Sequence, residues 1–396
     1  MLNLLWFLLP VAAAAGWFAA RRSAAKDPDA FWDHAQNFHK GLNVLLNEQT
    51  GKSEEVLFAN LEDLDRETAE THLALGNFYR RRGEVDRAIH LHERLMEKTE
   101  LGDEVQAAAQ FELARDFESA GLLDRSEATF RQLLETGYRE EDACKSLMQL
   151  HERERDWSQA SEVAKRALAL SEAVNDDERS DLLRYRIAHY RCELADEAQQ
   201  AGYLDEAHRL LLEADGLYPD GARAQFALAM AASELGDWES AVGHFQQVEN
   251  VQPSLLPDII KPWLKALGQL PSPEPLEKFI KQISARKNAY SVIRATREVI
   301  EQRHGAELAN RFFKDQVLKR PSLRGLRDWV ADQVAIAPSS EREKVQIIHT
   351  LLDDVIEDKA QYQCASCGFK GNQLHWRCPS CGNWDTVQTI IGVEGE

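Results

Sequence analysis

The chain has 396 residues, of which 66 are acidic and 47 basic, and its formal net charge is −19 at pH 7. Because a surface that binds duplex DNA or RNA has to neutralise phosphates, this charge argues against nucleic acid as a partner. Hydrophobic residues make up 44% of the chain, enough for packed cores, and its six cysteines are too few for a disulfide framework.

The first segment of the chain is apolar. Residues 4–20 carry no charge, and Trp6 and Trp17 lie towards the two ends, as aromatic side chains do at membrane interfaces. A cleaved signal peptide is the alternative, but it needs basic residues before its apolar stretch, whereas Arg21 and Arg22 follow this one. We therefore predict a transmembrane anchor over residues 1–22, with the rest of the chain on the cytoplasmic side.

The middle of the chain repeats itself. Four segments share a small residue, a Gly seven positions later and another small residue five positions after that: Gly76, Gly83 and Ala88; Ala114, Gly121 and Ser126; Ala195, Gly202 and Ala207; Ala229, Gly236 and Ala241. A fifth segment has Arg155 in place of the Gly, and a sixth fits loosely around Gly51. An acidic insertion over residues 171–183 lengthens one step of the repeat.

This pattern predicts pairs of short amphipathic helices. Gly ends the first helix because it accepts left-handed dihedral angles, and the small residues let two helices approach closely. Since no pair can bury its own apolar face, neighbouring pairs must stack. The skeleton resembles the tetratricopeptide repeat, which implies an all-α superhelical solenoid. We assign about six repeats to residues 35–255 and degenerate helical repeats to residues 256–357.

The C-terminal segment carries a metal-ligand pattern. Cys364, Cys367, Cys378 and Cys381 form a C-x2-C-x10-C-x2-C motif, and each pair is followed by Gly. Two such turns can bring four thiolates into a tetrahedron around one ion. A tail of this size cannot fold on core burial alone, so metal binding would supply its stability. We predict a small metal-binding ribbon over residues 358–396, with these four cysteines as its ligands.

The identity of the ion is open between iron and zinc. The second turn, CPSCG, resembles that of rubredoxins, which implies iron, although the two pairs are closer together than in free-standing rubredoxins. We also expect Tyr362, Phe369, Trp376 and Trp384 to form an apolar shell around the ribbon.

Enzyme signatures are missing from the sequence. No G-x-S-x-G, H-E-x-x-H or G-x-G-x-x-G motif occurs, and Gly51-Lys52-Ser53 lacks the first Gly of a phosphate-binding loop. We therefore predict no catalytic residues, no organic cofactor and no enzymatic activity.

The order of anchor, tetratricopeptide repeats and rubredoxin-like tail resembles the lipopolysaccharide assembly protein B family along the full chain. The resemblance implies an inner-membrane adaptor that faces the cytoplasm and modulates lipopolysaccharide biosynthesis. Its implied partners are the membrane protease FtsH, the lipid A deacetylase that FtsH degrades, and other lipopolysaccharide assembly proteins. Two alternatives remain at this point: a generic inner-membrane scaffold for envelope assembly and a rubredoxin-type electron carrier.

Overall fold

The computed structural model describes residues 66–357 and 359–395. The predicted anchor at residues 1–22 and the loose repeat around Gly51 lie outside this part of the chain. Within the described residues, no helix is both long and apolar enough to cross a bilayer. The chain divides into two compact units, residues 1–129 and 130–396, which are described separately below.

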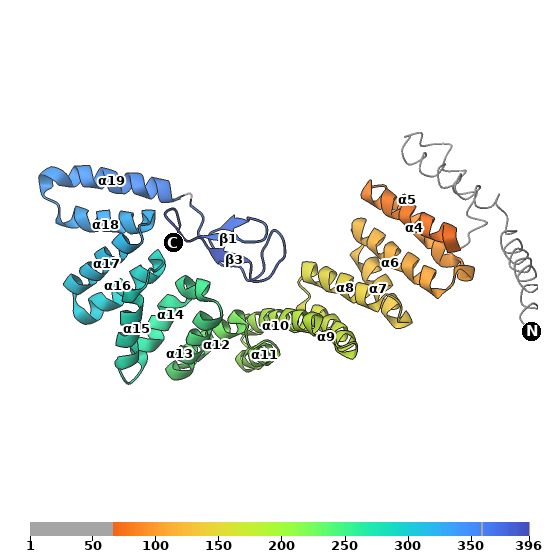
Figure 1. Cartoon of the computed structure of the whole chain (residues 1–396), viewed down its shortest axis with the longest axis horizontal. Coiled ribbons are helices and arrows are strands. Elements are labelled where there is room, and N and C mark those ends of the chain that lie inside the picture. Colours follow the sequence, from red (N-terminus) through yellow and green to blue (C-terminus); the bar gives the residue numbers. More distant parts are fainter. Residues whose placement is uncertain (1–65, 358, 396) are drawn as a thin grey trace, which may run out of the picture. The chain divides into compact units, whose positions relative to one another are not determined.

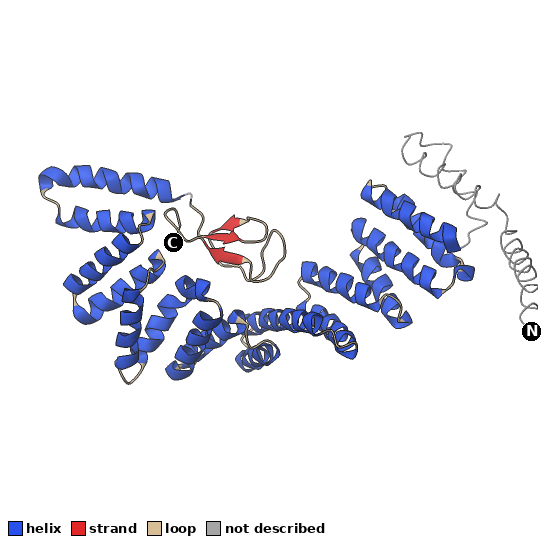
Figure 2. Ribbon diagram, in the orientation of Figure 1, coloured by secondary structure: helices blue, strands red, loops and turns tan. Residues whose placement is uncertain are grey.

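The described part of the first unit is helical throughout (Figure 2). It contains α4 (Arg66–Arg81), α5 (Val85–Glu97), the 3-10 helix η3 (Thr99–Leu101), α6 (Asp103–Ser119) and the beginning of α7 (Leu123–Thr136). α4, α5 and α6 pack against one another. A buried polar network joins them, in which Arg80 pairs with Glu112 and Asp116 at 2.7 Å each and Asp116 also contacts His92.

The second unit holds most of the helices. They are α8 (Glu140–Glu154), α9 (Trp157–Ala173), α10 (Asp177–Gln200), α11 (Leu204–Leu217), α12 (Ala222–Leu235), α13 (Trp238–Val251), η4 (Pro253–Leu255), α14 (Leu256–Gln269), α15 (Glu274–Ala285), α16 (Tyr290–His304), α17 (Ala306–Lys319), α18 (Leu323–Ile336) and α19 (Ser339–Glu357). Most successive helices pack on one another, although α16 packs on α14 rather than on α15, and Figure 1 shows the helices of this unit following an arc around the C-terminal ribbon.

The predicted turn positions lie between paired helices. Gly83, Gly121, Gly202 and Gly236 all have positive φ, and Arg155, which replaces Gly, is also left-handed at φ 60°. The small residues of the skeleton are buried, because each lies where two helices touch. At Gly76 the two helices approach so closely that a side chain would not fit, because a Cβ would lie 2.3 Å from Nε2 of His92 on α5.

A pair of glycine variants separates conformation from packing. Gly202 has φ 86°, whereas Gly216 is inside α11, and a Cβ at either position would meet no atom within 4 Å. Gly202→Ala should lower the free energy of unfolding by about 1 kcal/mol, because an alanine is strained in the left-handed region. Gly216→Ala, the control, should raise it by up to about 1 kcal/mol. Chemical denaturation measures the free energy of unfolding of both variants. Equal effects of the two substitutions would contradict the role of Gly202 as a residue needed for its left-handed backbone.

The last part of the acidic insertion, residues 177–183, begins the longest helix of the described part of the chain. Asn175 is left-handed at φ 55°, Asp176 caps the next helix by accepting from the Arg179 N–H at 3.1 Å, and α10 then runs for 24 residues. Tyr185 follows two residues after the insertion, and its side chain reaches the C-terminal ribbon.

Candidate metal centre and its docking surface

The C-terminal segment forms a small antiparallel sheet. Its strands are β1 (Tyr362–Cys364), β2 (Lys370–Gly371) and β3 (Val387–Thr389), in the order β2-β1-β3. β1 is central, with Tyr362 opposite Gly371 of β2 and Cys364 opposite Val387 of β3. The three strands form one small sheet (Figure 2), and the first cysteine lies at the end of its central strand.

The two cysteine pairs have the same local geometry. In each pair the N–H of the following glycine donates to the carbonyl of the first cysteine, from Gly368 to Cys364 at 3.0 Å and from Gly382 to Cys378 at 2.9 Å. Both glycines have positive φ, 77° and 73°, so the tight turn needs a residue without a Cβ. The first cysteine of each pair is buried and the second exposed.

The four sulfur atoms lie together. Cys364 Sγ is 3.8 Å from Cys381 Sγ, Cys367 Sγ is 3.7 Å from Cys378 Sγ, and all four lie within 4.8 Å of one another. Four sulfurs at about 2.3 Å from a central zinc ion would be separated from one another by about 3.8 Å. The cluster therefore fits one tetrahedrally coordinated ion, and the donor set of four sulfurs suits zinc or iron.

The two buried thiols differ in their electrostatic surroundings. A hydrogen bond with Thr386, helped by the backbone N–H groups of Ser366 and Cys367, lowers the pKa of Cys364 to about 6. Burial raises the pKa of Cys378 to about 11, against the opposing effect of the backbone N–H groups of the second turn. Because a metal binds the thiolate form, a bound cation would have to displace the proton held by Cys378.

The ribbon is docked on the helices of the second unit through Trp384. This buried side chain stacks on His189 of α10, with ring centroids 4.7 Å apart, and meets Trp157 of α9 and Tyr190 of α10 edge-on at 5.8 and 6.2 Å. The next residue, Asp385, contacts His189 Nε2 at 2.9 Å and accepts from the Tyr185 hydroxyl at 3.1 Å. Burial and the adjacent carboxylate raise the pKa of Tyr185, which keeps its hydroxyl a donor.

Arginines from both sides close this contact. Arg377 of the ribbon donates to the backbone carbonyl of Glu152 on α8 at 3.1 Å, and its guanidinium lies 5.8 Å from the Trp384 ring centroid. On the helix side, the buried Arg223 of α12 lies 5.6 Å from the same ring. Its charge is balanced by Glu193 at 2.9 Å and Asp196 at 2.8 Å. Two guanidinium groups thus lie close enough to the Trp384 ring for cation–π attraction.

A second contact lies further along the helices. Tyr362 donates to Asp258 of α14 at 2.6 Å, and the Thr389 hydroxyl is 3.4 Å from the same carboxylate. Trp376 packs against Phe226 of α12, with ring centroids 6.0 Å apart. The ribbon therefore contacts helices from α8 to α14.

The predicted aromatic shell divides into two roles. Tyr362 and Phe369 pack on the ribbon's own core of Cys364, Cys378 and Val387, as expected. Trp376 and Trp384 instead face the helices, because the ribbon's core is too small to bury two indole rings and the helices offer His189, Phe226 and Trp157. Sequence reasoning missed these partners on the helices. Nothing in the local sequence marks them, and the left-handed backbone of Asp385, at φ 53° directly after Trp384, is visible only in the structure.

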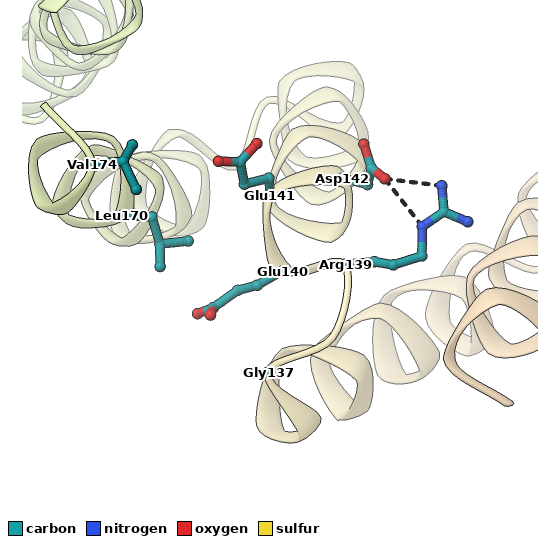
Figure 3. Close-up of a pocket in the computed structure, with 7 residues that line it drawn as sticks. All are labelled: Gly137, Arg139, Glu140, Glu141, Asp142, Leu170 and Val174. Atoms are coloured by element: carbon teal, nitrogen blue, oxygen red, sulfur yellow. Dashed lines mark hydrogen bonds and ion pairs between the residues drawn. The ribbon is translucent and has the colours of Figure 1, made fainter. Parts of the chain in front are cut away.

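A shallow pocket elsewhere in the second unit is a weaker candidate. It has a volume of about 380 Å³ and lies at the beginning of α8, lined by Gly137, Arg139, Glu140, Glu141, Asp142, Leu170 and Val174 (Figure 3). Arginines already engage its carboxylates, with Arg166 at 2.6 Å from Glu140, Arg139 at 2.9 Å from Asp142, and Arg179 beside Glu141. The ribbon and its docking surface are therefore the candidate functional site.

The fold and the four-sulfur cluster together define a tetratricopeptide-type helical scaffold that carries a metal ribbon. Residues 362–389 match a model of the rubredoxin metal binding domain, of the zinc-ribbon type, and residues 71–104 match a tetratricopeptide repeat. Among solved structures, MamA AMB-1 is 17% identical with a TM-score of 0.31, covering 47% of this chain and 92% of that one. The peptide-binding tetratricopeptide protein YrrB is 19% identical with a TM-score of 0.30, covering 46% and 85%.

Full-length relatives give the family. Lipopolysaccharide assembly protein B of Escherichia coli K12 is 32% identical over 398 residues, and the match covers 100% of both chains. Lipopolysaccharide assembly protein B of Haemophilus influenzae is 28% identical over 403 residues with the same coverage. The chain belongs to the lipopolysaccharide assembly protein B family.

Proposed function

We propose that this chain is a membrane-anchored cytoplasmic adaptor that modulates lipopolysaccharide biosynthesis by promoting proteolysis of the lipid A deacetylase by FtsH. The observation that carries the proposal is the full-length similarity to lipopolysaccharide assembly protein B. The repeat helices support an adaptor role, because stacked helix pairs offer an extended surface for protein partners. Residues 1–22 would hold that surface at the inner membrane, where confinement raises the effective concentration of a membrane-bound protease.

The ribbon has a structural part in this proposal. Cys364, Cys367, Cys378 and Cys381 would hold one ion, for which we favour zinc over iron because the matching model is of the zinc-ribbon type. The ion would keep the second turn folded, and that turn presents Arg377, Trp384 and Asp385 to the helices. Only a folded ribbon would dock on α8–α14, and partners would recognise the surface that the docked ribbon and these helices form together.

Depletion of the protein tests the proposed function. The half-life of the lipid A deacetylase should lengthen several-fold on depletion, and the same depletion in cells with inactive FtsH should add no further change. Re-expression of the native chain serves as the control and should restore rapid turnover. A generic envelope scaffold would instead alter the envelope while the deacetylase half-life stays constant, and that result would refute the adaptor role.

A further inference from the structure

A hydroxyl group of the ribbon lies beside the four sulfurs. Thr386 Oγ1 is 3.2 Å from Cys364 Sγ, although the two residues are 22 positions apart in the sequence. The corresponding cysteine of the second turn, Cys378, lies instead among the backbone N–H groups of its own turn and the other sulfurs of the cluster. The two turns therefore share their backbone geometry, but Cys364 has a side-chain partner in addition.

The backbone on both sides of Thr386 is held in place. Its carbonyl accepts from the Ala365 N–H at 2.7 Å, and the next residue, Val387, is paired with Cys364 in the sheet. The preceding residue, Asp385, is held on α10 by two hydrogen bonds. The short distance between the hydroxyl and the sulfur is therefore a property of the folded and docked ribbon.

The Thr386 hydroxyl has one proton and two acceptors within reach. The second acceptor is the carbonyl of Asn383 at 3.3 Å, which already accepts from the Cys378 N–H at 2.9 Å. A cysteine that binds a metal is a thiolate, which is negatively charged and can only accept. Because hydrogen bonds to charged acceptors are about twice as strong as those between neutral groups, the proton belongs to the Cys364 sulfur when an ion is bound.

We propose that Thr386 is a positioning residue of the metal centre, whose hydroxyl donates to the Cys364 thiolate and holds that sulfur in place for the ion. The hydrogen bond stabilises the negative charge of the sulfur and orients the Cys364 side chain before the ion binds. Groups that hydrogen-bond to metal ligands commonly contribute about 10- to 100-fold to metal affinity. The inference rests on the proposed metal centre and adds to it a residue outside the four ligands.

Competition between the full-length chain and a zinc chelator of known affinity measures the contribution of the hydroxyl. Thr386→Val keeps the shape of the side chain and removes the hydroxyl, so zinc should bind about tenfold more weakly. Thr386→Ser keeps the hydroxyl and should bind zinc as tightly as the native chain does. Thr389→Val on β3 is the matched control, because the Thr389 hydroxyl contacts Asp258 of α14, and it should leave zinc affinity unchanged.

The reduction potential of the iron-loaded chain separates the hydrogen bond from packing. Reduction of ferric to ferrous iron increases the negative charge on the sulfurs, so a hydrogen bond to a sulfur favours the reduced form. Thr386→Val should therefore have a lower reduction potential than the native chain, whereas Thr386→Ser and Thr389→Val should have the native value. A purely structural role of Thr386 would leave this potential unchanged.

The outcomes distinguish this inference from the proposal on which it rests. Equal zinc affinities of Thr386→Val and the native chain would overturn the inference and leave the metal centre intact. Equal losses in Thr386→Val and Thr386→Ser would also overturn it, because the serine variant still has the hydroxyl. Complete loss of zinc binding in Thr386→Val alone would support it. A native chain that binds neither zinc nor iron would refute the metal centre itself, and the inference with it.

Discussion

Replacement of Cys378 and Cys381 by serine should remove the bound ion and unfold the ribbon while the helices stay folded. Two of the four sulfurs disappear, and strands of three, two and three residues cannot hold a sheet by themselves. Structural zinc sites contribute about 10–16 kcal/mol of apparent binding free energy, so the whole of residues 362–389 should lose protection. The measurements are metal content by mass spectrometry, which also separates zinc from iron, and amide hydrogen exchange over the ribbon.

A cysteine outside the cluster provides the control for this experiment. Cys144 is a fully buried thiol on α8, so Cys144→Ala should keep one equivalent of metal and a protected ribbon. In cells, the double-serine chain should fail to shorten the deacetylase half-life, whereas the Cys144→Ala chain should succeed. Retention of the ion and of ribbon protection by the double-serine chain would show that the four cysteines are not the ligand set.

Trp384→Ala should release the ribbon from the helices without removing its metal. The substitution deletes the ring that stacks on His189 and that lies near Arg223 and Arg377, so both cations lose an aromatic neighbour. Truncation of a buried tryptophan costs about 3–5 kcal/mol. Limited proteolysis of the segment between α19 and β1 should become faster, and metal content should stay at one equivalent.

Trp329 on α18 is the matched control, because it is 38% exposed. Trp329→Ala should leave the proteolysis rate of that segment unchanged. If Trp384→Ala leaves both proteolysis and metal content unchanged, the ribbon is held by its other contacts, such as the one between Tyr362 and Asp258. The pair of variants therefore separates docking of the ribbon from its folding, which the cysteine variants alone cannot do.

These two predictions divide the proposed function into separable parts. Loss of metal removes the ribbon, whereas loss of Trp384 leaves a folded ribbon that no longer covers α8–α10. If regulation of the deacetylase needs the docked surface, both chains should fail in cells. If it needs only a folded ribbon, the Trp384→Ala chain should still work.

The sequence by itself determined the features that depend on local chemistry. Gly83, Gly121, Gly202 and Gly236 mark helix ends because a left-handed residue is needed there, whatever lies further away. The spacing of the four cysteines determined the cluster, because two residues between cysteines are enough to aim both sulfurs at one point. For the same reason helix pairs could be predicted from the sequence over residues 35–255, of which the structure describes residues 66–255.

Only the tertiary structure decided which surfaces meet. His189 and Asp385 are 196 residues apart, and Glu152 and Arg377 are 225 apart. Whether such residues touch depends on the small rotation between each helix pair and the next, added over many pairs. A local sequence pattern does not determine this total rotation. Trp384 was therefore recognisable as apolar but not as the centre of the docking surface.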